Sequence, residues 1–158
     1  MSDNWIAVIP YEPDYVPSTE QADAALSFLQ LLAPCSDEVK YSTDDQIRFR
    51  DCGVNLELIA CPFCGAHLDH EWWLERMAED SEGDVEDFHD RGFPLRPITV
   101  PCCARAASLN QLVYSFDQGF SRFILEAMNP NIDRLDEEDV RRLSDLLGTP
   151  LRVIYQHI

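Results

Sequence analysis

Two pairs of cysteines constrain the fold of this chain more than any other feature. Cys61 and Cys64 are separated by two residues and followed by Gly65, while Cys102 and Cys103 are adjacent. Two thiolates from each pair can surround a Zn²⁺ ion in tetrahedral geometry, with sulfur–zinc distances of about 2.3 Å. Four protein ligands leave no open position for water, which is typical of structural rather than catalytic sites. The spacing therefore predicts one structural zinc ion held by these four cysteines.

The second pair is irregular. If its segment is aligned with that of the first pair, Val100 falls where the first ligand should be. Cys102 would then supply the missing sulfur from the position beside Cys103, which requires an unusual local turn. His67 and Cys52, in that order, are alternative fourth ligands, because imidazole and thiolate both bind zinc.

Residues 54–111 resemble a zinc ribbon, in which a strand enters a CPxCG knuckle and a second knuckle follows after an insertion. The resemblance implies a unit that binds protein or nucleic acid, or that only stabilises the fold. The longer pattern CPFCG…WW…VPCC…SLNQLVYSF…GFSRFILE…NP is similar to an uncharacterised family of bacterial proteins and extends over most of the chain. This second resemblance implies no activity.

The CPFC motif also resembles the motif of glutaredoxins, and residues 99–101 are similar to their Thr-Val-Pro segment. A thiol-redox protein that uses Cys61 and Cys64 is therefore an alternative. Against it, Gly65 interrupts the helix that would have to begin at the first cysteine and lower its pKa, and the second cysteine pair would have no role. A zinc enzyme, in which three cysteines and a water bind the ion, is the remaining alternative.

Hydrophobic periodicity and capping signals predict the other elements. Ser18 and Gln21 form a capping box at the start of the first helix, and Asp136 caps the last helix, which Gly148 ends. The expected strands are 5–9, 38–41, 46–49, 54–60, 95–100, 112–116, 120–127 and 151–155, a further helix is 69–79, and an acidic loop is 80–90. Residues 42–45 should form a turn, and 117–119 should turn a hairpin between strands 112–116 and 120–127.

These elements read strand-helix-strand at each end of the chain. They predict an α+β fold with a ferredoxin-like split βαβ core built from residues 1–53 and 112–158. Residues 54–111 would form an inserted, zinc-ribbon-like unit.

The chain carries 29 acidic and 12 basic residues, a formal net charge of −17. Nucleic-acid affinity comes largely from Lys and Arg side chains that neutralise phosphates, so no nucleic-acid partner is expected. The acidity favours solubility and would attract a basic protein partner.

No segment approaches the roughly 20 apolar residues of a membrane span. The first residues lack the basic start and apolar run of a signal peptide, so a cytoplasmic location is expected. The sequence contains no phosphate-binding loop, no dinucleotide-binding glycine motif and no nucleophile elbow. We therefore expect a non-enzymatic, zinc-stabilised acidic protein that binds or regulates a partner.

Overall fold

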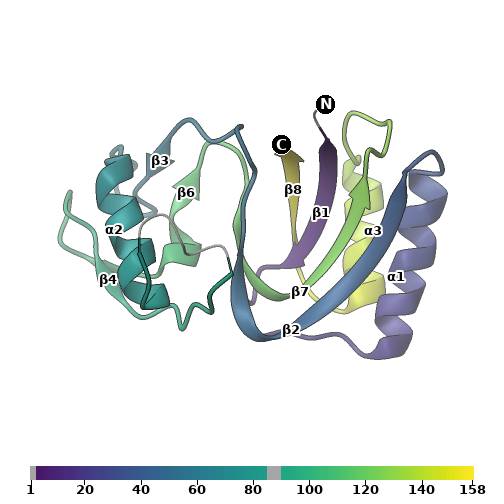
Figure 1. The fold of residues 1–158 in the computed structure, drawn as a ribbon, viewed down its shortest axis with the longest axis horizontal. Helices are drawn as coiled ribbons and strands as arrows, with labels where there is room; N and C mark the ends of the chain where they lie inside the picture. The colour runs from purple at the N-terminus through teal and green to yellow at the C-terminus, as the bar shows by residue number, and fades with distance from the viewer. Residues whose placement is uncertain (1–2, 85–89) are drawn as a thin grey trace.

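The computed structural model describes residues 3–84 and 90–158 and has the predicted α+β fold (Figure 1). The elements, in chain order, are β1 (Asn4–Pro10), α1 (Thr19–Leu32), β2 (Glu38–Arg50), β3 (Ile59–Ala60), α2 (His70–Ser81), β4 (Ile98–Thr99), β5 (Ala106–Ala107), the 3-10 helix η1 (Leu109–Gln111), β6 (Val113–Tyr114), β7 (Gly119–Met128), α3 (Glu137–Leu147) and β8 (Leu151–His157). We call β1, β2, β7, β8, α1 and α3 the sheet region. The remaining elements form the cysteine region.

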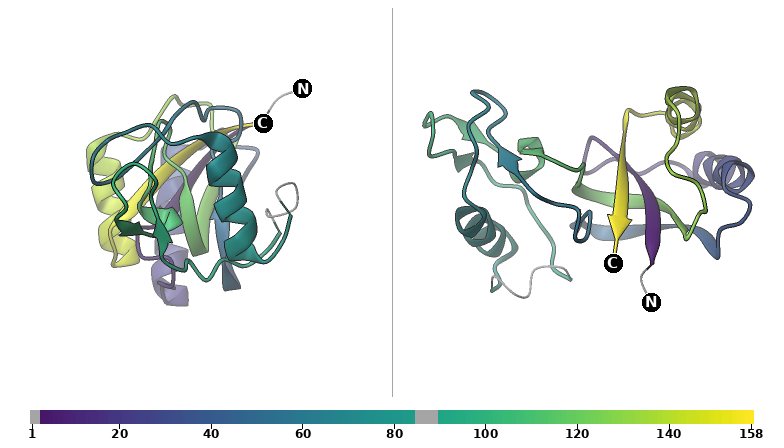
Figure 2. Two further views of the ribbon diagram at one scale, coloured as in Figure 1. Left: turned by 90° about the vertical axis from the view of Figure 1, so that its left-hand side faces the viewer. Right: turned by 90° about the horizontal axis from the view of Figure 1, so that it is seen from above.

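The four long strands of the sheet region form an antiparallel sheet in the order β2-β7-β1-β8. Each strand-helix-strand segment therefore has a strand of the other segment between its own two strands. α1 and α3 cover one face of this sheet, and the cysteine region lies on the opposite side (Figure 2).

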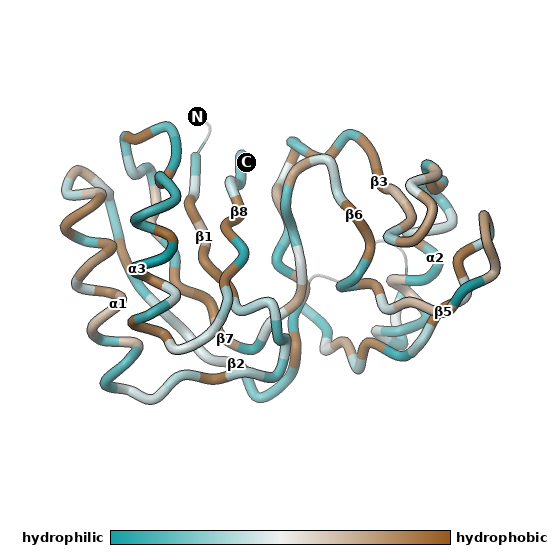
Figure 3. Tube along the Cα trace, turned by 180° about the vertical axis from the view of Figure 1, so that it is seen from behind, coloured by the Kyte–Doolittle hydropathy of each residue, from teal (hydrophilic) through white to brown (hydrophobic). Residues whose placement is uncertain are grey.

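The alternation of β1 explains how both faces of the sheet are used. Ile6 and Val8 face the helices, whereas Ala7 and Ile9 belong to a smaller buried cluster on the other face. Alternate residues of a strand point to opposite faces, so the buried part of this central strand is apolar at successive positions. The helix residues buried against it are Ala22, Ala25 and Leu29 of α1 and Leu143 and Leu147 of α3. In Figure 3, α1 is mostly hydrophobic, whereas α3 is mostly hydrophilic.

The caps predicted for two helices are confirmed. The Ser18 hydroxyl accepts a hydrogen bond from the Gln21 N–H, and the Gln21 side chain accepts one from the Ser18 N–H. The Asp136 carboxylate accepts from the Asp139 N–H, and α3 ends at Gly148, whose φ is 75°. These bonds satisfy N–H groups that have no partner within the helix.

The third predicted helix is also confirmed, with Asp69 as its N-cap. It continues to Ser81, so the predicted acidic loop begins later than residue 80. Residues 85–89 of that loop lie outside the described residues. None of the helices in residues 3–84 and 90–158 has the length and apolar character needed to cross a membrane.

β2 is one continuous strand, so the predicted turn at residues 42–45 is wrong. Its pairing with β7 changes register after Thr43 instead. The polar residues that suggested a turn are held by ion pairs, because the Asp44 carboxylate lies 2.8 Å from Arg50 and 3.4 Å from Arg48. Such a β-bulge bends a strand without removing it from the sheet.

The predicted hairpin of residues 112–116 and 120–127 is also wrong. β6 pairs with β3, with Ile59 opposite Tyr114, whereas β7 pairs with β1 and β2. Most residues of β7 are buried on both of its faces, so it lies inside the sheet between two other strands. The predicted turn at residues 117–119 therefore does not make β6 and β7 pair with each other.

Two further predicted strands are shorter than expected. Of residues 54–60 only β3 is a strand, and the N–H groups of Glu57 and Leu58 donate to the Ser115 hydroxyl instead of to a neighbouring strand. Of residues 95–100 only β4 is a strand. Leu95 has a φ of 59°, which the extended conformation does not allow.

The cysteine region has its own buried core, built largely from aromatic rings. Trp73 of α2 packs against Tyr114, with ring centroids 6.0 Å apart, and the Trp73 indole donates a hydrogen bond to the Tyr114 hydroxyl. Phe93 packs against Phe120 of β7 at 5.1 Å, and Phe120 packs against Phe49 of β2 at 5.2 Å. The cysteine region is therefore anchored on the ends of two strands of the sheet region.

Candidate metal centre

The four cysteines of the two pairs come together at the end of the cysteine region. Their sulfur atoms all lie within 4.8 Å of one another. The Sγ atoms of Cys61 and Cys103 are 3.8 Å apart, and those of Cys64 and Cys102 are 3.4 Å apart. Four sulfurs bound to zinc at 2.3 Å are about 3.8 Å apart in a tetrahedron, whereas a disulfide bond is about 2.05 Å long. The cluster therefore has the dimensions of a four-cysteine zinc site, and its cysteines are free thiols.

The first knuckle is a tight turn closed by backbone hydrogen bonds. The Cys61 N–H donates to the Ala66 carbonyl at 2.9 Å, and the Gly65 N–H donates to the Cys61 carbonyl at 3.1 Å. Gly65 has a φ of 75°, a conformation that glycine adopts without strain. The Phe63 N–H donates to the Cys61 sulfur at 3.4 Å. The CPxCG pattern thus builds a turn whose amides point at a thiolate.

The second knuckle has the same backbone hydrogen bonds. The Val100 N–H donates to the Arg105 carbonyl at 3.0 Å, and the Ala104 N–H donates to the Val100 carbonyl at 3.0 Å. Ala104 has a φ of 59°, as Gly65 does in the first knuckle at 75°. Val100 therefore occupies the position of the first ligand, as the alignment predicts. Cys102 reaches the cluster from the tip of the turn.

This arrangement explains how two adjacent residues contribute to one site. Cys103 stands where Cys64 stands in the first knuckle, and Cys102 stands where Phe63 stands. The Val100 side chain is fully buried and packs in the core of the cysteine region. In the second knuckle, the residue at the first-ligand position therefore packs in the core instead of binding the ion. Cys102, at the tip of the turn, supplies the sulfur.

A cation–π contact joins the two knuckles. The guanidinium of Arg105 lies 4.4 Å from the centroid of the Phe63 ring. Such a contact contributes about 0.5–1 kcal/mol at an exposed site. It holds together two turns that come from distant parts of the sequence.

The two alternative fourth ligands lie outside the cluster. His67 is exposed and forms an isolated bridge with Ala60. Cys52 is buried elsewhere, where its thiol donates to the side-chain oxygen of Gln118 at 3.4 Å. Burial raises the pKa of Cys52 to about 11, so this thiol stays protonated at neutral pH. The cluster therefore contains the first-ranked residue, Cys102, as its fourth member.

The sulfurs of the cluster differ in their affinity for protons. Burial raises the pKa of Cys61, but the N–H groups of Cys64 and Phe63 and neighbouring thiols outweigh burial and lower this pKa to about 6. Desolvation and hydrogen bonds to neighbouring thiols raise the pKa of Cys102 to about 12. Cys61 is thus the sulfur that the backbone best stabilises as a thiolate. Four sulfur donors, with the Cys61 sulfur supported by N–H groups of its knuckle, fit zinc, a borderline-soft cation.

The surroundings of Cys61 differ from a redox site of the glutaredoxin kind. The helix that follows the motif begins only at His70, so its N-terminus is not at Cys61. The backbone reverses at Gly65 instead. The nearest partners of the motif are the sulfurs of the second cysteine pair, for which a two-cysteine redox motif has no role.

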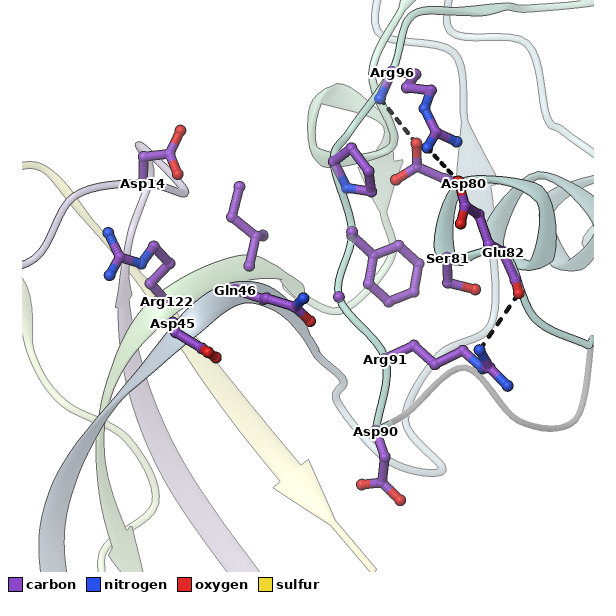
Figure 4. A pocket seen from close by; sticks show the side chains of 14 residues that line it. Asp14, Asp45, Gln46, Asp80, Ser81, Glu82, Asp90, Arg91, Arg96 and Arg122 are labelled. Atoms are coloured by element: carbon purple, nitrogen blue, oxygen red, sulfur yellow. Dashed lines mark hydrogen bonds and ion pairs between the residues drawn. The ribbon is translucent and has the colours of Figure 1, made fainter.

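The structure also contains a cavity of about 600 Å³ that the sequence did not indicate (Figure 4). It lies between β2 and the end of α2, and charged side chains line it. The buried Asp80 carboxylate accepts hydrogen bonds from the N–H groups of Leu95 and Arg96 at 2.8 and 2.9 Å. The Arg96 side chain forms an ion pair with Glu82 at 2.9 Å. The charged groups of Asp80, Glu82 and Arg96 are therefore already bonded to the chain that surrounds the cavity. The residues that line the cavity favour no class of ligand.

Comparison with protein-family models, with curated proteins and with solved structures finds no match to this chain. No family is therefore identified, and the resemblance to an uncharacterised bacterial family stays a prediction. The candidate metal centre rests on the geometry of the four sulfurs and of the two knuckles.

Proposed function

We propose that this chain is a non-enzymatic binding or regulatory protein stabilised by one structural zinc ion bound to Cys61, Cys64, Cys102 and Cys103. The observation that carries this proposal is the convergence of four thiol sulfurs within 4.8 Å of one another. Four sulfur ligands complete a tetrahedron and leave no position for a reactive water.

The architecture that we propose is a ferredoxin-like split βαβ core of residues 1–53 and 112–158, interrupted by a zinc-ribbon-like unit of residues 54–111. The strand order β2-β7-β1-β8 supports the core, because each strand-helix-strand segment brackets a strand of the other. The two knuckles support the ribbon-like unit. One follows β3, and the other lies between the paired strands β4 and β5.

A structural role for zinc follows from the shortness of the nearby strands. β3, β4, β5 and β6 have two residues each. Isolated pairs of such strands are unstable in water. An ion that joins the two knuckles would close the intervening chain into a loop and contribute its binding free energy to folding.

Metal analysis of the purified protein tests the proposal directly. We expect one zinc per chain, and we expect thiol titration to find the cluster cysteines protected until a strong chelator is added. The exposed Cys35, which lies outside the cluster, should react in either case and calibrates the titration. Metal-free protein whose four cluster thiols react freely would overturn the proposal.

The same measurement separates the two alternatives. A thiol-redox protein would be purified without zinc and would contain a reactive Cys61. A zinc enzyme with three cysteine ligands would contain zinc, but one cluster thiol would react without chelator. We expect neither outcome, because the four sulfurs lie at comparable distances.

A double variant tests the assignment of the second knuckle. Val100→Cys combined with Cys102→Ser moves the sulfur from the tip of the turn to the position equivalent to Cys61. Because the backbones of the two turns make the same hydrogen bonds, we expect the variant to retain one zinc per chain. Cys102→Ser alone should bind zinc more weakly. A double variant that binds no better than this single variant would contradict the proposed equivalence.

The partner-binding part of the proposal rests on the acidic surface. Negative side chains concentrate at the start of α3, namely Asp133, Asp136, Glu137, Glu138 and Asp139. Desolvation, followed by the charge of Asp136, raises the pKa of Asp139. The crowding of carboxylates at this place would favour a basic protein partner, which would lower their mutual repulsion.

Salt dependence tests this part. Binding of a basic partner should weaken steeply as the ionic strength rises toward about 0.1 M, where the Debye length is about 10 Å. Glu137→Gln with Glu138→Gln should weaken it further, whereas Glu20→Gln with Glu71→Gln, a matched pair of exposed acidic residues elsewhere, should change it less. Binding that is insensitive to salt and to both pairs would contradict an electrostatic partner site.

A further inference from the structure

The four sulfurs of the cluster are unequally protected from solvent. Cys61 is buried and Cys103 is partly buried, and both pack in the core of the cysteine region. Cys64 and Cys102 are exposed. The cluster therefore consists of an inner pair and an outer pair, and an oxidant that arrives from solvent meets the outer pair.

The two sulfurs of the outer pair also lie closer together than the two sulfurs of the inner pair. The Cys64 and Cys102 sulfurs are 3.4 Å apart, against 3.8 Å for Cys61 and Cys103. A disulfide bond of about 2.05 Å needs an approach of about 1.4 Å by the outer sulfurs. The two residues stand on different knuckles, so small movements of two surface turns suffice.

Hydrogen bonds distinguish Cys102 from the first ligand of the other knuckle. The Cys61 sulfur accepts the Phe63 N–H, which draws electron density from the thiolate. Within the described residues, the hydrogen-bonding contacts of the Cys102 sulfur are with the neighbouring sulfurs, and the Cys64 sulfur lies 3.4 Å away. When zinc holds both residues as thiolates, the sulfur that accepts no N–H hydrogen bond keeps more electron density and is the better nucleophile, and its exposure gives oxidants access.

We propose that Cys64 and Cys102 form an oxidative modification site, at which a hydroperoxide converts the two zinc-bound thiolates into a disulfide and releases the zinc. This inference rests on the structural zinc site proposed above. It adds a regulated state to that site, because the modification removes two of the four ligands at once.

The reaction balances with hydrogen peroxide as the oxidant. The Cys102 thiolate attacks one peroxide oxygen, the O–O bond breaks, and hydroxide leaves while a sulfenic acid forms. The Cys64 thiolate then attacks the sulfenyl sulfur, the S–S bond forms, and a second hydroxide leaves. The two sulfurs lose two electrons, the peroxide gains them, and two protons from the buffer convert both hydroxides to water.

Loss of the outer pair leaves two sulfurs for the ion. Two thiolates do not close a tetrahedral site, so zinc would leave, and the binding free energy that stabilised the cysteine region would leave with it. Reduction of the disulfide by a thiol would restore all four ligands. The modification is thus reversible, unlike oxidation to a sulfinic acid.

The experiment treats the zinc-loaded full chain with hydrogen peroxide, follows zinc release with a chromogenic chelator, and maps disulfides by mass spectrometry. Tryptic peptides 51–76 and 92–105 carry the two halves of the cluster, so fragmentation of the cross-linked pair identifies its sulfurs. We expect one zinc released per chain together with a Cys64–Cys102 disulfide. A reducing thiol and added zinc should reverse both.

Two variants sharpen the result. Cys102→His keeps four zinc ligands but removes one partner of the disulfide, so zinc release should slow by about tenfold or more. Cys35→Ser, which removes an exposed thiol outside the cluster, should release zinc at the rate of the unchanged chain. If Cys102→His fails to bind zinc, the disulfide map of the unchanged chain still shows whether Cys64 and Cys102 are the residues that become linked.

Three outcomes would overturn the inference and leave the structural site intact. They are zinc retained under peroxide, zinc released without a disulfide, and a disulfide between Cys61 and Cys64. A chain that contains no zinc as purified would instead overturn both the site and its modification.

Discussion

The sheet region and the cysteine region are held together in different ways. The strands of the sheet region have seven to thirteen residues and pair over most of their length. The strands of the cysteine region have two residues each. The sheet region is therefore held by regular backbone hydrogen bonds between long strands and by a helix-covered core. The cysteine region depends on a small aromatic core and four sulfurs.

The dependence between the regions runs mainly in one direction. The cysteine region packs on Phe49 and Phe120, which belong to β2 and β7. Among the described residues, none of the cysteine region belongs to the helix-side core of the sheet region. We infer that the cysteine region can open while the helix-covered sheet persists, and that a zinc ion bound to the four sulfurs would keep it closed.

The largest effect is expected from Cys61→Ser. Loss of the buried ligand should abolish zinc binding and lower the free energy of unfolding by at least about 4 kcal/mol, because metal-binding free energy is folding free energy. Hydrogen exchange should become fast in α2 and around the knuckles while β1 and β7 stay protected. Cys35→Ser, at an exposed thiol, should change stability by less than about 0.5 kcal/mol. Unchanged thermal unfolding of Cys61→Ser would contradict a structural metal.

Leu143→Ala should affect the other region. Leu143 is fully buried between α3 and the sheet, and its truncation should cost about 3 kcal/mol. Zinc content should stay at one per chain, since this core does not include the knuckles. Leu31→Ala, at an α1 residue that is 78% exposed, is the matched control and should cost under about 0.5 kcal/mol. Zinc loss in Leu143→Ala under native conditions would show that the regions do not open separately.

The two knuckles should respond in opposite ways to a glycine–alanine exchange. Gly65→Ala should destabilise the protein by about 1 kcal/mol through its positive φ alone, because a Cβ atom there meets no neighbouring atom. Ala104→Gly should stabilise it by up to about 0.5 kcal/mol, since glycine relieves the strain but loses more entropy on folding. Urea unfolding of the zinc-loaded variants measures both. Equal signs for the two exchanges would contradict the equivalence of the turns.

The last prediction concerns Cys52, whose effect is confined to high pH. Burial raises the pKa of this thiol from its ordinary value of 9.0 to about 11, so the unfolded chain loses this proton first. The free energy of unfolding should therefore fall as pH rises from about 9 to about 11, and the contribution is fully present below this range. Cys52→Ala should flatten this part of the profile. A parallel profile for the variant and the unchanged chain, measured by urea unfolding, would show that Cys52 does not contribute.

Several features followed from the sequence by itself, because local interactions determine them. The three helices and the caps at Ser18 and Asp136 depend on residues within one turn of the cap. The buried faces of α1 and α3 follow from a spacing of three and four residues. Cysteine spacing indicated the four candidate ligands, and Val100 was identified as the substitute for a ligand.

Only the tertiary structure decided which strands pair and which sulfur completes the cluster. β6 joins β3, and β2 continues through a polar segment, because strands distant in sequence pair with their backbone groups. Cys102 joins the cluster, whereas His67 and Cys52 do not, because the fold of two separate turns sets where each side chain lies. Local sequence specifies how a segment bends, but pairing and metal geometry depend on contacts between segments, and the packed chain alone determines these.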